Sequence, residues 1–239
     1  MDIGKVCDAG GRRVNEDKIL AVEASGSLGC FAVADGLGGH SGGDLAAEIV
    51  LGEIERGFRA SPEIGEARLK SLIESAHGVL TEKAEADAAH KRMRTTLAVL
   101  VTDGEKAVWA HIGDSRIYRF KDGKMESVTA DHSVAYLAYK NDEISYDEIR
   151  RSPDQNRLLR SLGAETEPRA EFGEAEIESG DAFLLCSDGF WELIDENEME
   201  KTLKKSKTAS RWIAKMVRQL KKNAPDGEYD NYSAITVMI

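Results

Sequence analysis

The sequence is poor in residues that crosslink or interrupt a chain. Its 239 residues include only three cysteines, Cys7, Cys30 and Cys186, and four prolines. The cysteines are odd in number, far apart and set in apolar runs, which argues against a disulfide framework or a zinc site and predicts reduced thiols in a cytoplasmic protein. A chain of this length buries roughly 70 to 75% of its unfolded surface. It therefore needs no structural metal, and a bound metal would serve function.

Long apolar segments and excess positive charge are also missing. The longest apolar runs, such as Leu97–Val101, are far shorter than the about 20 residues of a membrane-spanning helix. Residues 1–13 lack the apolar core of a signal peptide. The chain has 43 acidic and 32 basic residues, a net charge of −11, which disfavours binding to nucleic acid or to an anionic membrane. We expect a monomer with neither partner.

The remaining composition, 41% hydrophobic and 31% charged, is typical of a globular protein. With no internal repeat and no linker-like segment, residues 1–239 are expected to form one domain. Apolar β-rich runs predict the strands Lys18–Val22, Cys30–Ala34, Thr96–Thr102, Ala107–Ile112, Ile117–Phe120, Ala182–Cys186 and Ile235–Ile239. Asp-Gly turns at 102–105 and 121–124 predict antiparallel hairpins.

Apolar residues recur at helical spacing in three segments, 45–58, 61–80 and 209–220. Ser61, Pro62 and Glu63 are a good start signal for the second helix, because serine caps a helix and proline suits its first position. Helices in two groups beside hairpin strands predict an α+β sandwich, with the helices packed outside antiparallel sheets.

The segment 131–168 is polar and has few strand-like runs. Short helical patterns occur near 134–139 and 146–151. We interpret this segment as a surface flap over or beside the functional site, since exposed connecting segments often carry function.

Several predicted strands have a carboxylate at one end. These acidic residues are Glu16, Asp17, Asp35, Asp114, Asp188 and Asp230. Any single Asp-Gly pair is most simply a turn, because this is a common turn dipeptide. Taken together, clustered carboxylates repel one another unless cations neutralise them. An all-oxygen ligand set favours Mg²⁺ or Mn²⁺, and a carboxylate that bridges two such ions can hold a water between them as a nucleophile.

An ordered set of motifs covers nearly the whole chain. The motifs are GRRVNED at 11–17, VADGLGGH at 33–40, TTL at 95–97, IGDSR at 112–116, TADHS at 129–133, LCSDGFW at 185–191 and DN at 230–231. Any one is weak, but in this order the sequence resembles the PPM or type 2C metal-dependent protein Ser/Thr phosphatases in their compact bacterial form. The resemblance implies a four-layer α+β sandwich, two antiparallel sheets flanked by helices, with a metal centre at one end.

The resemblance also implies a set of metal ligands. By position, Asp35 bridges two metals, Asp188 and Asp230 complete the first site, and the carbonyl of Gly36 serves the second. Asp114, together with Asp188, matches a third and weaker site of the family. The implied cofactors are Mg²⁺ or Mn²⁺, with two tight sites and a possible weaker third.

Other matched residues surround these ligands. Glu16 and Asp17 are implied to act on the second metal through its waters. Arg12 stands where the family has its phosphate-binding arginine, and a guanidinium can bind phosphate oxygens in a bidentate way. Arg13 is the alternative, because neighbouring residues on an extended segment face opposite ways. His40 lies near a histidine proposed in the family as a general acid, or is a loop residue.

Four further residues are given mainly structural interpretations. Arg94 replaces the small residue usual in the family before the Thr-Thr pair, and it either adds positive charge near the substrate or is a solvated loop residue. His111 and His132 are interpreted as structural, one at a strand end and one beside the flap. Cys186 is interpreted as a core residue rather than a nucleophile because it lies within an apolar run.

The leading hypothesis is a phosphatase of phosphoserine and phosphothreonine in proteins that opposes a bacterial-type Ser/Thr kinase. A catalytically silent relative that binds phosphoproteins is a second hypothesis, which the presence of Asp35, Asp188 and Asp230 disfavours. A third is a metal-dependent hydrolase of another phosphoester, such as a nucleotide, which differs only in substrate.

Overall fold

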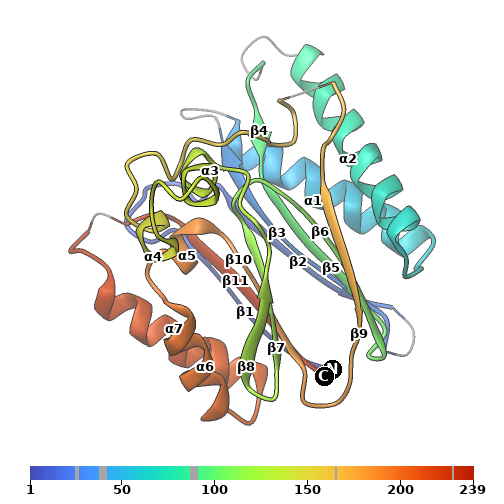
Figure 1. Ribbon diagram of the computed structural model, residues 1–239. Helices are drawn as coiled ribbons and strands as arrows, with labels where there is room; N and C mark the ends of the chain where they lie inside the picture. Colours follow the sequence, from blue (N-terminus) through green and yellow to red (C-terminus); the bar gives the residue numbers. More distant parts are fainter. Residues whose placement is uncertain (25–26, 38–41, 87–90, 165, 228) are drawn as a thin grey trace.

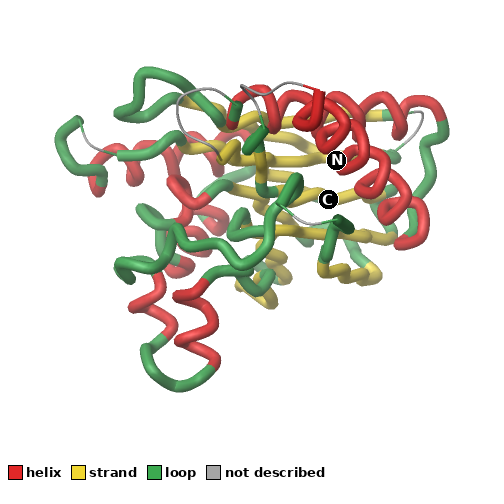
Figure 2. The backbone as a smooth tube through the Cα atoms, turned by 90° about the horizontal axis from the view of Figure 1, so that it is seen from above, coloured by secondary structure: helices red, strands yellow, loops and turns green. Residues whose placement is uncertain are grey.

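Two antiparallel β-sheets stack against each other, and helices cover the outer face of each sheet (Figure 1). The structure is a computed structural model that describes residues 1–24, 27–37, 42–86, 91–164, 166–227 and 229–239. Figure 2 shows the strands of both sheets together, with helices outside them. This architecture confirms the predicted α+β four-layer sandwich.

Each sheet is an antiparallel ladder. The five-stranded sheet has the order β1 (Asp2–Asp8), β11 (Tyr232–Met238), β10 (Ala182–Cys186), β7 (Arg116–Lys121) and β8 (Lys124–Val128). The six-stranded sheet has the order β2 (Asp17–Glu23), β3 (Gly29–Leu37), β5 (Leu97–Thr102), β6 (Lys106–Ile112) and β9 (Glu171–Glu176), and β4 (Arg94–Thr95) pairs with β3. The hairpins predicted at 102–105 and 121–124 join β5 to β6 and β7 to β8.

The central strand β3 is buried on both faces, which explains its continuous apolar sequence. Phe31 and Val33 pack into the core between the two sheets. Cys30 and Ala32, on the opposite face, pack into the core under the helices. Alternate side chains of a strand point to opposite faces, so a strand between two cores needs apolar residues at every position.

Four of the described helices form the outer layers. α1 (Gly43–Ala60) and α2 (Glu66–Ala86) pack on the six-stranded sheet, and α6 (Glu196–Lys204) and α7 (Ala209–Asn223) pack on the five-stranded sheet. A single turn, α5 (Asp188–Trp191), directly follows β10. The stripes predicted at 45–58 and 209–220 are the buried faces of α1 and α7. Within the described ranges, none of the helices combines the length and apolar character needed to span a membrane.

The segment 131–168 contains two short helices, α3 (Val134–Lys140) and α4 (Tyr146–Ile149). Both lie beside one end of the sheets (Figure 1). An isolated bridge between Thr95 and Leu162 joins this segment to β4, and another joins Ser133 to Leu158 within it.

The start predicted for the second helix at Ser61 to Glu63 is wrong, because α2 begins at Glu66. Ser61 ends α1 instead, and its backbone N–H donates to the carbonyl of Gly57. Arg68 of α2 donates to the carbonyls of Gly57 and Ser61 at 2.6 and 3.2 Å. Ser61, Pro62 and Glu63 therefore lie in the connection between α1 and α2 rather than at the start of α2.

Three of the strands that sequence patterns missed, β1, β8 and β9, are at sheet edges. Their sequences DIGKVCD, KMESV and EFGEAE are mixed and mostly polar. An edge strand faces solvent along one side, so it needs fewer apolar residues than a central strand. Their pairing partners in the folded protein, rather than their own sequences, make them strands.

Candidate active site

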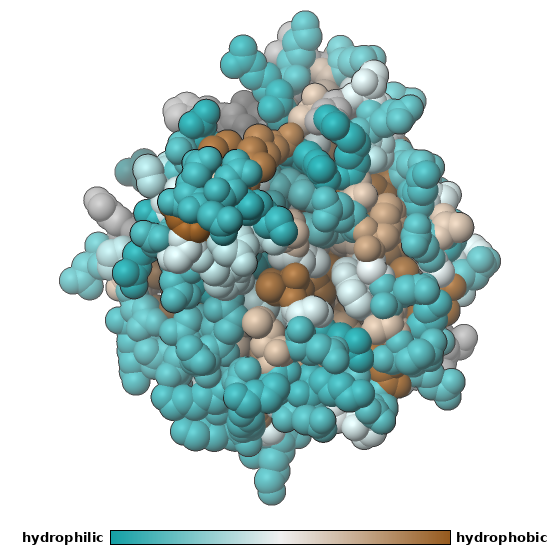
Figure 3. Space-filling model, viewed as in Figure 1, coloured by the Kyte–Doolittle hydropathy of each residue, from teal (hydrophilic) through white to brown (hydrophobic). Residues whose placement is uncertain are grey.

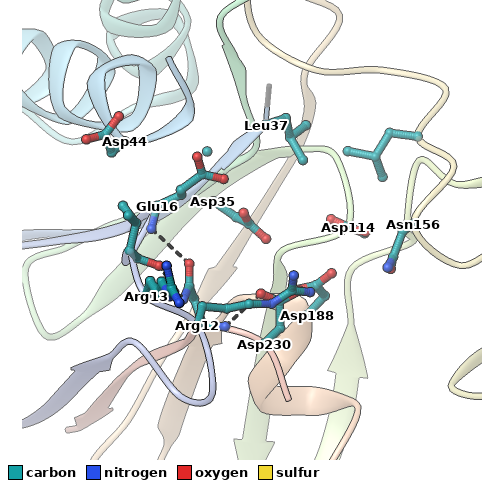
Figure 4. A pocket seen from close by; sticks show the side chains of 14 residues that line it. Arg12, Arg13, Glu16, Asp35, Leu37, Asp44, Asp114, Asn156, Asp188 and Asp230 are labelled. Atoms are coloured by element: carbon teal, nitrogen blue, oxygen red, sulfur yellow. Dashed lines mark hydrogen bonds and ion pairs between the residues drawn. The ribbon is translucent and has the colours of Figure 1, made fainter. Parts of the chain in front are cut away.

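Acidic side chains from several strand ends meet at one end of the sandwich. They line a cavity of about 570 Å³, shown in Figure 4. The lining residues are Arg12, Arg13, Val14, Glu16, Asp35, Gly36, Leu37, Asp44, Asp114, Asn156, Leu158, Asp188, Asp230 and Asn231. The chain termini lie far from this cavity, at the other end of the sandwich (Figure 1). There Asp2, at the start of β1, pairs with Met238, at the end of β11.

Antiparallel pairing explains why these residues meet. β3 and β6 run toward the cavity and end near Asp35 and Asp114, and β10 runs toward it and ends just before Asp188. β2 and β11 run away from it and begin after Glu16 and Asp230. In an antiparallel sheet, the end of one strand adjoins the beginning of the next, so residues far apart in sequence share one edge.

The carboxylates of this cavity destabilise one another's charge. Desolvation, followed by the charges of Asp188, Asp17 and Asp114, raises the pKa of Asp35 well above its ordinary value. Burial and the charge of Asp230 raise the pKa of Asp188 to about 6. Acids that repel one another in this way favour the binding of a cation, because a positive charge offsets the repulsion that raises their pKa values.

Asp17 does not line the cavity but lies buried behind it, 1% exposed. Its Oδ2 accepts a hydrogen bond from Ser187 Oγ at 2.7 Å, whereas its buried Oδ1 has no partner among the described residues. Burial, followed by the charges of Asp188 and Asp230, raises its pKa to about 7. The unpartnered oxygen of Asp17 is available to accept a hydrogen bond from a group bound nearby.

Glu16 is positioned by the loop that precedes β2. Its backbone N–H donates to Asn231 Oδ1 at 2.8 Å, and Asn231 Nδ2 donates to the carbonyls of Ala9 and Val14. Burial, followed by the charges of Asp44 and Asp230, raises the pKa of Glu16. Asn231 therefore fixes this loop against the start of β11.

Gly36 lies where β3 approaches α1 closely. A Cβ atom added to Gly36 would lie 2.1 Å from the carbonyl oxygen of Gly43. Only glycine permits this approach, so any other residue at position 36 would push β3 and α1 apart. The backbone of Gly36 thus lines the cavity beside Asp35.

Arg12 and Arg13 both line the cavity (Figure 4). Arg12 Nη2 forms an ion pair with Asp230 Oδ2 at 2.9 Å, and the Arg12 side chain is 61% exposed. Arg13 makes no ion pair or side-chain hydrogen bond among the described residues. Arg12 thus has a carboxylate partner inside the cavity and remains accessible to a ligand.

Asp114 is 3% exposed and follows Gly113, which has a φ of 99° that favours glycine. Trp191 Nε1 donates to the backbone carbonyl of Asp114 at 2.9 Å, a contact that does not involve the carboxylate, and Asp114 lines the cavity. Burial and the charges of Asp188 and Asp131 raise the pKa of Asp114 well above its ordinary value.

The structure also places residues near the site that sequence reasoning missed. Glu192 lines a second cavity together with Arg12, Asn156 and Asp230. Burial, followed by the charges of Asp188 and Asp230, raises the pKa of Glu192 to about 8, and its Oε1 has no partner in the described part of the chain. Its position four residues after Asp188, one helical turn, is a signal that could have revealed it.

Asp44, Asn156, Ser187 and Asn231 were missed as well. Asp44 is in the first turn of α1, and Asn156 comes from the segment 131–168. A single sequence gives little sign that either residue reaches the cavity. Ser187 and Asn231, in contrast, lie directly beside Asp188 and Asp230 in the motifs.

The remaining candidates lie apart from the acidic cavity. His40 lies outside the described residues. Arg94, in β4, lines an adjoining cavity. Cys186 is fully buried in the core next to α5 and α7, and burial raises the pKa of its thiol, which is unsuited to a nucleophile.

His111 and His132 form a buried stacked pair with ring centroids 4.6 Å apart. His111 Nε2 lies 2.7 Å from the carbonyl of Ala130, and His132 Nδ1 accepts from the Gly113 backbone N–H at 3.1 Å. His132 Nε2 is 3.2 Å from Glu171 Oε1. These backbone contacts give the pair a structural role in attaching the segment after residue 130 to β6.

The donor set of the acidic cavity fits divalent cations that prefer oxygen. Its potential ligands are carboxylates and one backbone carbonyl, the ligand types typical of Mg²⁺ and Mn²⁺. The unpartnered oxygens of Asp17 and Glu192 agree with this, since buried polar atoms normally have partners.

Comparison with known proteins agrees with this arrangement. The profile of the protein phosphatase 2C family matches residues 9–230. The chain is 30% identical over 231 residues to the serine/threonine phosphatase stp of Listeria monocytogenes, covering 95% of this chain and 90% of that protein. It is 30% identical to the protein phosphatase PhpP of Streptococcus pneumoniae, covering 83% and 82%.

A solved structure shows the same similarity in three dimensions. The serine/threonine phosphatase PstP/Ppp of Mycobacterium tuberculosis has a TM-score of 0.85 and 25% identity, covering 99% of this chain and 97% of that one. The fold and the acidic cavity are those of a phosphatase with a metal-binding centre. The chain belongs to the protein phosphatase 2C family, as its motifs predicted, and it is a protein-serine/threonine phosphatase.

Proposed function

We propose that this protein binds two divalent cations, Mg²⁺ or Mn²⁺, in the acidic cavity and hydrolyses phosphoserine and phosphothreonine there with the help of Arg12. The observation that carries the proposal is that six acids and the exposed Arg12 line one cavity. Arg12 can bind the phosphate dianion while the acids hold the cations.

The individual roles follow the family pattern. Asp35 would hold both cations, with Asp188 and Asp230 as the further residues for one of them and the Gly36 carbonyl for the other. The position of these four residues along one cavity supports this assignment. Asp114 would contribute with Asp188 to a third and weaker site, and its buried position at the cavity supports this assignment.

Glu16 and Asp17 contribute more indirectly to the second site. Glu16 faces the cavity, and Asp17 is held behind it by Ser187. Both would act on the cation through water molecules rather than by direct contact. A role for His40 as general acid stays a prediction.

The reaction is a direct transfer of the phosphoryl group to water. When bound, the cations supply charge neutralisation and lower the pKa of water, so that a nucleophile exists at neutral pH. The oxygen of the attacking water would form a bond to phosphorus as the bond from phosphorus to the seryl or threonyl oxygen breaks. Arg12 binds the phosphate oxygens and orients the group for in-line attack. The seryl or threonyl oxygen takes up the proton that the water loses, and inorganic phosphate is released.

The other proposed properties concern context. The segment 131–168 acts as a flap of a single domain, supported by Asn156 and Leu158, which line the cavity. The protein acts as a cytoplasmic monomer that opposes a Ser/Thr kinase. Its free cysteines, two of them buried, fit a reducing compartment. A silent binding protein would have no need of the complete acid set at Asp35, Asp188 and Asp230.

The test is the release of phosphate from a phosphothreonine peptide and from p-nitrophenyl phosphate, with Mn²⁺ and then with excess EDTA. We expect turnover with Mn²⁺ and none with EDTA. A nucleoside triphosphate is the matched alternative substrate, and a strong preference for it over phosphopeptides would contradict the proposed substrate class. Full activity in EDTA would contradict the metal dependence.

A further inference from the structure

A further cavity, distinct from the one lined by Glu192 and here named the arginine pocket, adjoins the acidic cavity. It has a volume of about 420 Å³, and its lining residues are Leu37, Arg92, Arg94, Asn156, Leu158 and Ser161. Leu37, Asn156 and Leu158 also line the acidic cavity. The two cavities therefore share a wall, and a substrate bound in one can extend into the other.

The arginine pocket differs from the acidic cavity in charge. Six acids line the acidic cavity, whereas none of the described residues that line the arginine pocket is acidic. Arg92 and Arg94 are both exposed, and neither side chain has an ion-pair or hydrogen-bond partner among the residues that the structure describes. The surface seen in Figure 3 is mostly hydrophilic, and the chain as a whole carries a charge of −11. Two unpaired guanidinium groups at this place are available to an anionic ligand.

Backbone pairing holds Arg94 in place. In β4, Arg94 pairs with Leu37 and Thr95 pairs with Gly36 of β3. Thr95 also exchanges two backbone hydrogen bonds with Leu162, of 3.2 and 2.9 Å. Directly opposite residues in an antiparallel pair share a face, so Arg94 lies on the same face as Leu37, which reaches both cavities.

We infer that Arg92 and Arg94 form a subsite for an anionic side chain, either a carboxylate or a second phosphate, close to the phosphorylated residue of the substrate. This inference rests on the proposed function, which places the phosphorylated residue in the acidic cavity. A guanidinium group binds carboxylate and phosphate oxygens with a matching geometry. Successive side chains of an extended peptide are roughly 3.3 Å apart along the chain, so an anion within a few residues of the phosphorylated position is the one that can reach an adjoining cavity.

The experiment compares phosphothreonine peptides that carry alanine, aspartate, lysine or phosphoserine at each position within three residues of the phosphothreonine. We expect the wild-type kcat/KM for the best aspartate or phosphoserine peptide to exceed that of the alanine peptide about fivefold, with the ratio falling as salt increases. In the double variant Arg92→Ala/Arg94→Ala, this ratio should fall to about one. The matched control is Lys91→Ala, since Lys91 is exposed and adjacent but does not line the arginine pocket.

The arms of the experiment separate the two sources of the anion. A phosphoserine peptide cleaved much faster than its aspartate counterpart would identify doubly phosphorylated substrates, and equal rates would identify acidic sequences. No wild-type preference, or a preference that the double variant retains, would overturn the inference. An equal fall for all peptides and for p-nitrophenyl phosphate would also overturn it, because it would show that the arginines only support β4.

The failure of the proposed function would look different. In that case the wild-type protein would release no phosphate from any peptide or from p-nitrophenyl phosphate in Mn²⁺. Binding of the same peptides, labelled with a fluorophore and measured by anisotropy, then tests the subsite without turnover. Tighter binding of anionic peptides that is lost in the double variant supports the subsite, and equal binding of all peptides overturns it.

Discussion

Asp17 and Asp35 lie directly opposite each other in the register of β2 and β3. Side chains in this relationship share one face of the sheet, and two like charges there are destabilising. The charge of Asp17 is accordingly one of the causes that raise the pKa of Asp35. The fold therefore brings together two carboxylates that disfavour each other until cations are bound.

The first prediction concerns Asp35. Asp35→Asn should lower kcat/KM at least about 100-fold, because changing even the outer partners of metal ligands costs 10- to 100-fold. The thermal midpoint in EDTA should stay equal to or exceed that of the wild type, since repulsion is relieved. Phosphate release and thermal unfolding on the same preparation check both statements. A metal-free variant that unfolds at a much lower temperature would assign Asp35 a structural role instead.

The second prediction concerns pH in the absence of metal. The pKa of Asp17 is raised to about 7 and that of Asp188 to about 6. Each folded-state carboxyl keeps a proton that the unfolded chain loses near pH 4, so its stabilising contribution is present at low pH. That contribution is lost as the pH rises from about 4 to about 7. Thermal midpoints in EDTA should thus decrease over this range.

Two controls accompany this pH series. Adding Mn²⁺ at pH 7.5 should raise the thermal midpoint, because a ligand that binds only the folded state stabilises it. Asp188→Asn should flatten the pH dependence measured in EDTA. A thermal midpoint in EDTA that rises steadily between pH 4 and pH 7 would contradict the assignment of raised pKa values to these acids.

The sequence predicted the central strands and the main acids because both have strong local signals. β3 and β10 are buried on both faces and are apolar at nearly every position, and Asp35 and Asp188 follow their apolar runs directly. The edge strands β1, β8 and β9 could not be predicted in this way, since their conformation depends on partners far away in the sequence.

The parts of the site that the sequence did not predict depend on tertiary contacts. Asn156 reaches the cavity only because the segment 131–168 folds back along the sheets, and no local pattern encodes that path. The separation of Asp17 from the cavity is likewise invisible in the sequence, where it is adjacent to Glu16. Strand alternation turns these neighbours in different directions.

The third prediction distinguishes Arg12 from Arg13. Arg12→Ala should lower kcat/KM about 10- to 100-fold, the loss expected for hydrogen bonds to a charged group. Stability should change little, because the ion pair of Arg12 with Asp230 is largely exposed and such pairs contribute about 0 to 1 kcal/mol. Arg12→Lys should recover only part of the activity, since the bidentate geometry is lost. Wild-type kinetics for Arg12→Ala, with a defect in Arg13→Ala, would transfer the role to Arg13.

The fourth prediction concerns the buried ion pair of Arg116 with Asp131. The two side chains are 2% and 1% exposed and are joined by hydrogen bonds of 2.8 and 2.6 Å. Asp131→Ala should lower the free energy of unfolding by about 3 to 5 kcal/mol, because it leaves a buried charge without its carboxylate. Urea unfolding in EDTA measures the change.

The matched control for this pair is Glu126→Ala. Glu126 pairs with Arg119 at 3.0 Å but is 44% exposed, so its removal should cost less than about 1 kcal/mol. Equal losses in the two variants would show that the pair of Arg116 with Asp131 is no more important to stability than a surface ion pair.

The last prediction concerns Asp114, which separates a two-metal from a three-metal site. Its backbone carbonyl is already bonded to Trp191, so Asp114→Ala removes only the carboxylate and keeps that contact. If the carboxylate helps to hold a weak third cation, kcat should fall about tenfold or more at saturating Mn²⁺, with an unchanged or higher thermal midpoint in EDTA. If it only caps the turn, stability should fall by about 1 kcal/mol and kcat should be spared. Measuring kcat and the thermal midpoint on one preparation decides between them, and a lower midpoint with unchanged turnover would remove Asp114 from the metal centre.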